Sequence, residues 1–239
     1  MVNKKTVLVT GSAKGIGKEL IIKFAKKGYN VVINYLSSKE EALKLKKLVE
    51  KEYDVKALAI KADISNEDEV INMVKKVKNE FLKIDVLINN AAYTCDNNYK
   101  DKTKKEFMRV LEVNVVGTFL VTKYASDIMN DGVVINVSSR DSLDTYNELS
   151  MDYCASKAAV NSLCQTFSQA LPNIRCLSIL LPWVNTESIR EMLPEYLEAE
   201  LKRTKQKRLM EPSLVSDIIY NYINDKNIKS GSIIKIENP

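Results

Sequence analysis

Tyr153 and Lys157 are the pair of side chains whose types and spacing best suit acid–base chemistry in this sequence. They stand four residues apart in a stretch rich in Ala, Ser and Leu, which predicts a helix that carries both on one face. An ammonium group beside a phenol favours the phenolate, so we expect Lys157 to bring the pKa of Tyr153 from about 10 toward neutrality. Tyr153 would then exchange a proton with a substrate oxygen. Taken alone, such a pair is also common on solvent-exposed helices.

Composition narrows the chemistry further. Histidine is absent from the 239 residues, which excludes Ser-His-Asp and Cys-His catalysis and any histidine-ligated metal site, and we expect no metal. The four cysteines lack C-x-x-C spacing, and with no signal peptide in the sequence we expect reduced thiols in a cytoplasmic protein. No apolar run approaches the ~20 residues of a membrane span. Acid–base chemistry must therefore use Tyr, Lys or carboxylate groups.

The net charge of +5 arises from 36 basic and 31 acidic side chains. The lysines are scattered along helical stretches rather than clustered, which is typical of solvated helix faces and argues against nucleic-acid binding. An anionic cofactor or substrate is compatible with this charge.

A glycine-rich loop opens the chain. The segment from Thr10 to Gly17 holds three of the seven glycines, follows the apolar run 6–10 and precedes a helical pattern that ends at Gly28. Glycine lets the backbone approach a pyrophosphate, and the start of the following helix offers free N–H groups. The order strand, loop and helix therefore predicts a dinucleotide site, with G-x-x-x-G-x-G spacing instead of G-x-G-x-x-G.

Apolar β-branched runs and helical patterns alternate along the rest of the chain. We expect an α/β protein with a single-domain doubly wound Rossmann fold over 1–239, built on a parallel seven-stranded sheet with helices on both faces. The charged helical segment 187–208 breaks the alternation, and we interpret it as a mobile flap over the substrate site. A fixed helical hairpin on the surface is the alternative. The expected strands are 6–10, 31–33, 57–60, 86–88, 133–137, 176–181 and 233–236, and the main helices 16–28, 38–52, 67–81, 103–129, the Tyr153 helix and 213–223.

The second strand indicates which dinucleotide is used. An NAD enzyme commonly places an acid about 20 residues beyond the glycine loop, but here the second strand ends in residues 34–38, with no acid until Glu40. Ser37 can hydrogen-bond a 2′-phosphate, and Lys14 supplies a positive charge from the loop. The pattern favours NADP(H), with NAD(H) or use of both as the alternative.

Several motifs in one order give the chain its resemblance to the short-chain dehydrogenase/reductase family, over essentially its whole length. Gly11, Gly15 and Gly17 match the T-G-x-x-x-G-x-G loop, Asp63 the aspartate at the adenine, and 89–91 the N-N-A motif. The resemblance implies a catalytic tetrad of Asn114, Ser139, Tyr153 and Lys157. It also implies cofactor contacts from Gly11, Ser12, Lys14, Gly15, Ile16, Gly17, Ser37, Asp63, Ile64, Asn90, Ala91, Tyr153, Lys157, Val184 and Thr186.

By this resemblance Tyr153 gives a proton to the substrate oxygen as hydride arrives from the nicotinamide, while Ser139 polarises the carbonyl. Lys157 lowers the tyrosine pKa and holds the nicotinamide ribose. Asn114 holds a water that connects Lys157 to solvent.

Four features depart from the family pattern. Tyr153 stands 14 positions after Ser139, one more than usual, so we expect the intervening loop to bulge or Ser138 to share the role. Ala92 replaces the glycine of N-N-A-G, and Leu181-Pro182 replaces Pro-Gly after the sixth strand. The residues 237–239 replace a terminal D-G-G. These changes leave open the shape of the nicotinamide loop and the family's tetramer interface.

The leading interpretation is an NADP(H)-dependent carbonyl reductase or alcohol dehydrogenase that resembles 3-oxoacyl-carrier-protein reductases. A glucose-dehydrogenase-like or other alcohol dehydrogenase, and a low-activity binding protein that senses NADPH, stay open as alternatives. We expect a small carbonyl or alcohol substrate, a homo-oligomer (dimer or tetramer), and neither nucleic acid nor membrane as partner. The substrate pocket is expected from Tyr93, 141–149 and 183–192.

Overall fold

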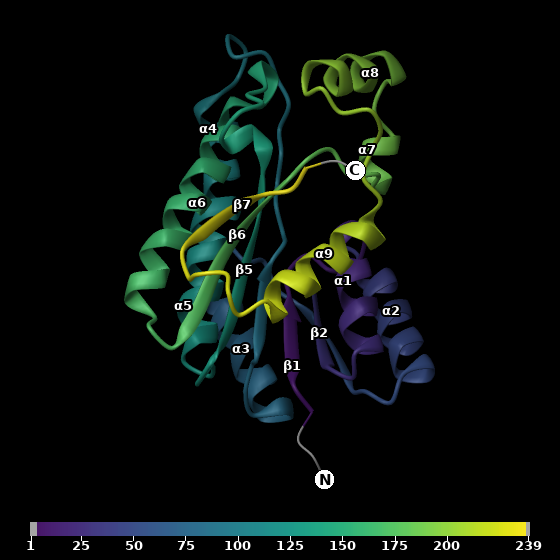
Figure 1. The fold of residues 1–239 in the computed structure, drawn as a ribbon, viewed down its shortest axis with the longest axis vertical. Coiled ribbons are helices and arrows are strands. Elements are labelled where there is room, and N and C mark those ends of the chain that lie inside the picture. Colours follow the sequence, from purple (N-terminus) through teal and green to yellow (C-terminus); the bar gives the residue numbers. More distant parts are fainter. Residues whose placement is uncertain (1–3, 238–239) are drawn as a thin grey trace.

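Seven parallel strands form one sheet in the computed structural model, which describes residues 4–237 (Figure 1). The sheet order is β3-β2-β1-β4-β5-β6-β7, so the chain reverses its direction of winding between β1 and β4. This confirms the predicted doubly wound fold. The strands are β1 (Thr6–Val9), β2 (Asn30–Tyr35), β3 (Ala57–Lys61), β4 (Val86–Asn89), β5 (Gly132–Ser139), β6 (Ile174–Leu181) and β7 (Ser232–Lys235).

Helices cover both faces of the sheet because its central strands are apolar on both sides. Adjacent residues Val7 and Leu8 of β1 are both fully buried, one in each of the two hydrophobic cores. The first face carries α1 (Gly15–Lys26), α2 (Lys39–Glu52) and α9 (Pro212–Asn224). The second face carries α3 (Glu67–Phe81), α4 (Lys104–Leu111), α5 (Gly117–Ser126) and α6 (Met151–Ala170).

The helical region predicted over 103–129 is not one continuous α-helix. A single π-helical stretch, Glu112–Val116, separates α4 from α5, and α5 ends at Ser126. The start of α4 agrees with the prediction, because Thr103 and Glu106 form a capping box there. A π turn widens the helix locally and often marks a functional position, and this one contains Asn114.

Two further segments, 140–150 and 187–203, lie above the carboxyl ends of the strands. Residues 140–150, the loop between Ser139 and α6 that we call the serine loop, contain two 3₁₀ turns, Arg140–Ser142 and Glu148–Ser150. The short α7 (Glu187–Arg190) and α8 (Pro194–Arg203) stand at the same end, at the top of Figure 1. Pro194 separates the two helices, since it occupies the first turn of α8, where no backbone N–H is needed.

The segment predicted as a flap is hydrogen-bonded to the serine loop. Asn147 donates to the Tyr196 hydroxyl at 3.0 Å and to the Glu200 carboxylate at 3.2 Å. Arg203 donates to the carbonyl oxygens of Thr145 and Tyr146 at 2.6 and 2.8 Å. These contacts join α8 to residues 145–147, so any opening of the segment must break them.

No helix within residues 4–237 is both long and apolar enough to cross a bilayer. The four cysteines are free thiols, and Cys154, Cys164 and Cys176 are buried. Burial raises the pKa of Cys164 to about 11 and that of Cys176 to about 12, so both stay protonated and pack as small apolar groups.

Candidate active site

A cavity of about 330 Å³ lies at the carboxyl end of the sheet, beside the ends of β4, β5 and β6. Ser139, Tyr153 and Lys157 line it from β5 and α6, and Ile16 lines it from the glycine-loop side. The topology explains this convergence, because parallel strands deliver their carboxyl ends to one edge. The cavity thus brings together three of the four predicted catalytic residues.

Ser139, not Ser138, faces the phenol of Tyr153. The Ser139 hydroxyl hydrogen-bonds Tyr153 and also accepts from the Asp141 N–H at 3.1 Å. Ser138 is 2% exposed, and its hydroxyl donates to the Lys157 carbonyl oxygen at 3.3 Å. Successive residues of a strand point to opposite sides, so the two serines cannot both direct their hydroxyls at Tyr153.

The pKa of Tyr153 differs from the prediction. Burial raises it, and the Asp141 carboxylate raises it further, while the hydrogen bond from Ser139 lowers it. The ammonium of Lys157 lies 5.5 Å from the centre of the Tyr153 ring and donates to the Val137 carbonyl oxygen. The expectation that Lys157 brings this pKa toward neutrality is therefore wrong for the protein alone, because desolvation of the phenolate and the nearby Asp141 carboxylate raise the pKa.

Lys157 is 4% exposed, and its ammonium donates to the Val137 carbonyl oxygen at 2.6 Å. Burial lowers its pKa from 10.5 to about 8, because an ammonium group loses hydration inside the protein. The side chain therefore changes charge close to the physiological range, which suits a group that takes part in proton movement.

Asn114 is buried and fully engaged in holding the chain in place. Its amide nitrogen donates to the Tyr93 carbonyl and the Ser156 hydroxyl, both at 2.9 Å, and its oxygen accepts from the Tyr93 N–H at 2.7 Å. Both amide hydrogens are thus used. The side chain fixes the loop after β4 against α6 and has no free donor for the predicted water.

The glycine loop has the shape that a pyrophosphate needs. Gly11 has φ +59°, and a Cβ there would lie 2.9 Å from Ala91. A Cβ on Gly17 would lie 2.6 Å from Ser12 Cα. No side chain caps the start of α1, so its first N–H groups remain available to an anion. These residues fit the pyrophosphate of a dinucleotide.

Asn34 is a part of this loop that the sequence reasoning missed. It is 2% exposed at the end of β2, and its side-chain oxygen accepts from the Gly11 N–H at 3.1 Å. Its amide nitrogen donates to the Ala62 carbonyl at 3.0 Å. It therefore ties the ends of β1, β2 and β3 together. A polar residue within an otherwise apolar strand is the signal that would have found it.

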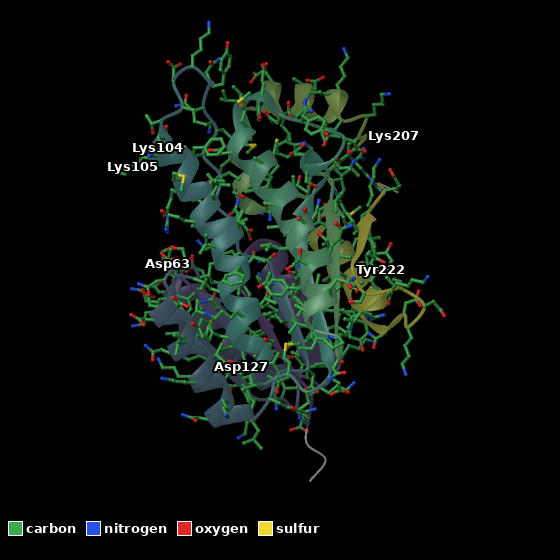
Figure 2. All side chains as sticks on the ribbon, turned by 90° about the vertical axis from the view of Figure 1, so that its left-hand side faces the viewer. Asp63, Lys104, Lys105, Asp127, Lys207 and Tyr222 are labelled. Atoms are coloured by element: carbon green, nitrogen blue, oxygen red, sulfur yellow. The ribbon has the colours of Figure 1, made fainter. Side chains whose placement is uncertain are left out.

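A second cavity of about 350 Å³ continues from the glycine loop toward β3. Asp63 lies at its edge, and Figure 2 labels it. Arg109, which was not predicted, pairs with Asp63 at 3.0 Å, and hydrogen bonds from Ser65 and Arg109 hold the Asp63 pKa below its usual value despite some burial. Predicted cofactor residues among the lining of this cavity are Gly11, Asp63, Ile64, Asn90 and Ala91.

Three predicted cofactor contacts need correction or qualification. The Ser12 hydroxyl is buried and donates to the Val9 carbonyl at 2.8 Å, so its side chain points into the protein. Lys14 forms an ion pair with Glu41 at 3.2 Å, so an acid does reach this corner, from the first turn of α2. Ser37 is exposed in the turn after β2 and lines neither cavity.

The loop after β6 is ordered by Gln206. Its side-chain oxygen accepts from the Trp183 N–H at 2.9 Å, and its nitrogen donates to the Trp183 carbonyl at 2.7 Å. Val184 forms a bridge with Met210, which fixes the next residue. Val184 and Thr186 both line the first cavity, and Thr186 approaches Gly15. Although Leu181-Pro182 replaces the usual Pro-Gly, Val184 and Thr186 still line the cavity as predicted.

The substrate side of the first cavity has both polar and apolar lining residues. Residues from 141–149 and 183–192 line it as predicted, whereas Tyr93 lies in the second cavity. Within residues 4–237, no group of three His, Cys, Asp or Glu side chains is arranged to hold a metal ion. Asn238 and Pro239 of the altered C-terminus lie outside the described residues. The polar residues that line this side include Thr94, Asp96, Arg140, Asp141, Thr145, Asn147 and Ser150, and the apolar ones include Trp183, Ile189 and Met192.

The doubly wound sheet, the glycine loop and the adjoining cavities together define a dinucleotide-dependent oxidoreductase. Residues 5–196 match the sequence model of the short chain dehydrogenase family. The chain belongs to this family of NAD(P)-dependent enzymes.

Two curated relatives are similar over much of the chain. A 3-oxoacyl-(acyl-carrier-protein) reductase of Staphylococcus aureus (strain Mu50) is 35% identical over 170 residues, which cover 70% of this chain and 68% of that protein. The reductase of the same name from Staphylococcus epidermidis (strain ATCC 35984) is 29% identical over 227 residues, or 93% of this chain and 92% of that protein.

Solved structures share the fold. A short-chain dehydrogenase/reductase from Serratia marcescens BCRC 10948 superposes with a TM-score of 0.91 at 24% identity, covering 99% of this chain and 98% of that one. A short chain dehydrogenase from Burkholderia cenocepacia J2315, solved in complex with NADP, gives a TM-score of 0.90 at 24% identity, covering 98% and 96%.

Proposed function

We propose that this protein is an NADP(H)-dependent oxidoreductase that interconverts a carbonyl and a secondary alcohol. The observation that carries the proposal is the hydrogen-bonded pair of Tyr153 and Ser139 at the cavity wall, with the buried ammonium of Lys157 beneath it. Two hydroxyl groups that meet beside a cavity can hold one substrate oxygen between them.

Each residue has a stated part in this reaction. The nicotinamide, when bound, supplies or accepts the hydride. Tyr153 gives its proton to the substrate oxygen, and Ser139 donates a hydrogen bond to the same oxygen. Lys157, whose pKa is about 8, holds the nicotinamide ribose and passes a proton toward Tyr153. Asn114 acts by position, since it fixes the loop after β4 against α6.

The preference for NADP(H) rests on Lys14. Its ammonium pairs with Glu41 in the first turn of α2, and Ser37 lies exposed just before that helix. A 2′-phosphate would replace the Glu41 carboxylate as the partner of Lys14, because phosphate carries more charge. The pairing with Glu41 weakens this preference, so NAD(H) is the second candidate cofactor.

Two classes of substrate are each supported by an observation. The names of the curated relatives support a 3-oxoacyl thioester. The polar lining around Asp96 and Asn147 supports a hydroxylated substrate of the kind that glucose-dehydrogenase-like enzymes use. An NADPH sensor would bind cofactor without turnover.

We further propose that 1–239 is one domain, with 187–208 as its substrate flap. We also propose that the protein is cytoplasmic, because its four cysteines are free thiols.

A homo-oligomer is supported by exposed apolar side chains on α4 to α6, the helices that face the viewer in Figure 2. Light scattering of wild type and of a Phe119→Asp variant tests this proposal: the variant should have the lower mass, and a wild-type mass of a single chain would overturn it. The side chains concerned are Met108, Val116, Phe119 and Met151.

A fluorescence titration tests the proposed function. Trp183, the single tryptophan, lines the cavity together with Tyr153 and Lys157. NADPH should quench its emission with energy transfer to the bound dihydronicotinamide, at lower concentration than NADH, and a panel of ketones should then be reduced. Absence of binding by both cofactors would overturn the proposal, and binding without turnover of any ketone would leave the sensor.

A further inference from the structure

Asp141 is a carboxylate in the wall of the proposed substrate cavity, two residues beyond Ser139. Its side chain is 14% exposed. Thr145 donates to it at 2.7 Å, and the first 3₁₀ turn after β5 holds its main chain, since the Asp141 N–H donates to Ser139. The carboxylate therefore has a fixed position beside the reacting groups.

The charge of Asp141 is only weakly compensated. Arg203 lies 3.9 Å away, but the same guanidinium makes two shorter contacts with Glu200, at 2.9 and 2.5 Å. One cation thus serves two carboxylates. Asp96, at the same cavity, adds a further carboxyl group, which accepts from the Ser150 hydroxyl. The cavity beside Tyr153 therefore offers two carboxyl groups that can accept hydrogen bonds from a ligand, besides the cationic side chains of Arg140 and Lys157.

Ser139 has one hydroxyl hydrogen and two neighbours that compete for it. Its hydroxyl hydrogen-bonds both the Asp141 carboxylate and the Tyr153 phenol. A carboxylate is a stronger acceptor than a neutral phenol, so Asp141 takes the hydrogen when no substrate is bound. The proposed reaction needs that hydrogen on the substrate oxygen. Something else must then donate to Asp141.

We propose that the substrate itself supplies this donor: Asp141 binds a hydroxyl or ammonium group on the carbon next to the reacting carbon, and the contact frees Ser139 to polarise the reacting oxygen. The substrate class is therefore a 1,2-diol or 2-hydroxy ketone, or a vicinal amino alcohol. This inference rests on the proposed function, because it assumes that Ser139 and Tyr153 hold the reacting oxygen.

The geometry supports this class over a 3-oxoacyl thioester. The carbon between the two carbonyl groups of such a thioester carries no hydroxyl or amine, so Asp141 would face an acceptor oxygen or an alkyl group. A buried carboxylate that loses the Ser139 hydrogen and gains no donor from the substrate is unfavourable in either case, because within residues 4–237 only Thr145 still donates to it. Burial raises the pKa of Asp141, consistent with a group that lacks a full partner in the protein.

The test compares matched ketones and alcohols with purified wild type, Asp141→Asn and Asp144→Asn. The ketone pair is 3-hydroxybutan-2-one against butan-2-one with NADPH, and the alcohol pair is 1-aminopropan-2-ol against butan-2-ol with NADP⁺. Acetoacetyl-coenzyme A is the thioester probe. Asp144 is the matched control, because it belongs to the same loop and pairs with Lys235 and Arg140, but does not itself line the cavity.

We expect wild type and Asp144→Asn to favour the donor-bearing member of a pair in kcat/KM by about tenfold to a hundredfold. Asp141→Asn should lose most of that preference for the amine or the hydroxyl and keep its NADPH affinity. Comparison of the ketone pair with the alcohol pair shows whether Asp141 binds the hydroxyl or the ammonium group.

Equal kcat/KM within each pair, a preference that survives in Asp141→Asn, or faster reduction of acetoacetyl-coenzyme A than of the hydroxy ketone would overturn the inference. In those cases a Tyr153→Phe variant without turnover would leave the proposed function standing. Failure of wild type to turn over every compound, with NADPH bound, would overturn both.

Discussion

Replacement of Lys157 by Met tests the burial of its charge. The pKa of Lys157 falls from 10.5 to about 8 on folding. Below about pH 8 both folded and unfolded chains carry the charge, so wild type bears the full cost of burying it; between about pH 8 and 10.5 the folded chain loses the proton first and this cost disappears. The pKa difference corresponds to about 3 kcal/mol of unfolding free energy.

The assay is urea unfolding of both proteins from about pH 7 to about pH 10.5, followed by circular dichroism. The stability of Lys157→Met minus that of wild type should fall by about 3 kcal/mol over this range. The bond from Lys157 to the Val137 carbonyl sets an offset between the two proteins, but the fall does not depend on that offset. Tyr153 stays protonated throughout, because its pKa is raised.

Lys105→Met is the control, since Lys105 is exposed at the start of α4 (Figure 2). Its stability relative to wild type should stay level across the same range. If the Lys157→Met difference were equally level, Lys157 would titrate alike in the folded and unfolded chains. That result would refute the reasoning that burial governs its charge.

Three further changes have defined outcomes. Gly17→Ala should weaken NADPH binding at least about tenfold in calorimetry, because its methyl would lie 2.6 Å from the main chain of the glycine loop; unchanged affinity would contradict this. Glu41→Gln should tighten NADPH binding several-fold and leave NADH unchanged, because Lys14 loses its competing partner; an equal change for both cofactors would show that the pair does not read the 2′-phosphate. Lys102→Met should lower the free energy of unfolding by about 3 to 5 kcal/mol, because it leaves the Asp152 carboxylate buried without its ion pair; a loss below about 1 kcal/mol would argue against this.

Local sequence patterns were sufficient to predict the sheet and the glycine loop. Runs such as Val31–Ile33 are apolar on both sides, which is typical of a strand that is covered on both faces. Because helical patterns alternate with these runs, the strands are predicted to be parallel, as they are in the structure. Gly17 could be identified because three glycines occur within seven residues between a strand and a helix, and such a cluster indicates a backbone that side chains would obstruct.

The parts that could not be predicted depend on contacts between distant residues. The ion pair between Lys14 and Glu41 could not be predicted, because no local pattern indicates that the first turn of α2 lies beside the glycine loop. The pKa of Tyr153 depends on how deeply α6 buries the phenol and on Asp141, neither of which follows from the four-residue spacing to Lys157. Side-chain environments of this kind arise only when the chain has folded.

The helix that carries Asn114 shows the same limit. A continuous α-helix was the natural expectation from its apolar pattern, and the capping box at Thr103 agrees with it. The π turn around Asn114 arises with three side-chain bonds to Tyr93 and Ser156, and these partners are 21 and 42 residues away. No local pattern records such bonds.

The most direct test of the account is the rate of NADPH oxidation by Tyr153→Phe, with saturating NADPH and the ketone that wild type reduces fastest. The variant keeps the ring but lacks the proton donor, so the rate should fall by about 10² to 10⁴. Quenching of Trp183 should show NADPH affinity within about twofold of wild type. A rate within a few-fold of wild type would contradict the assignment of Tyr153 as the acid and, with it, the proposed mechanism.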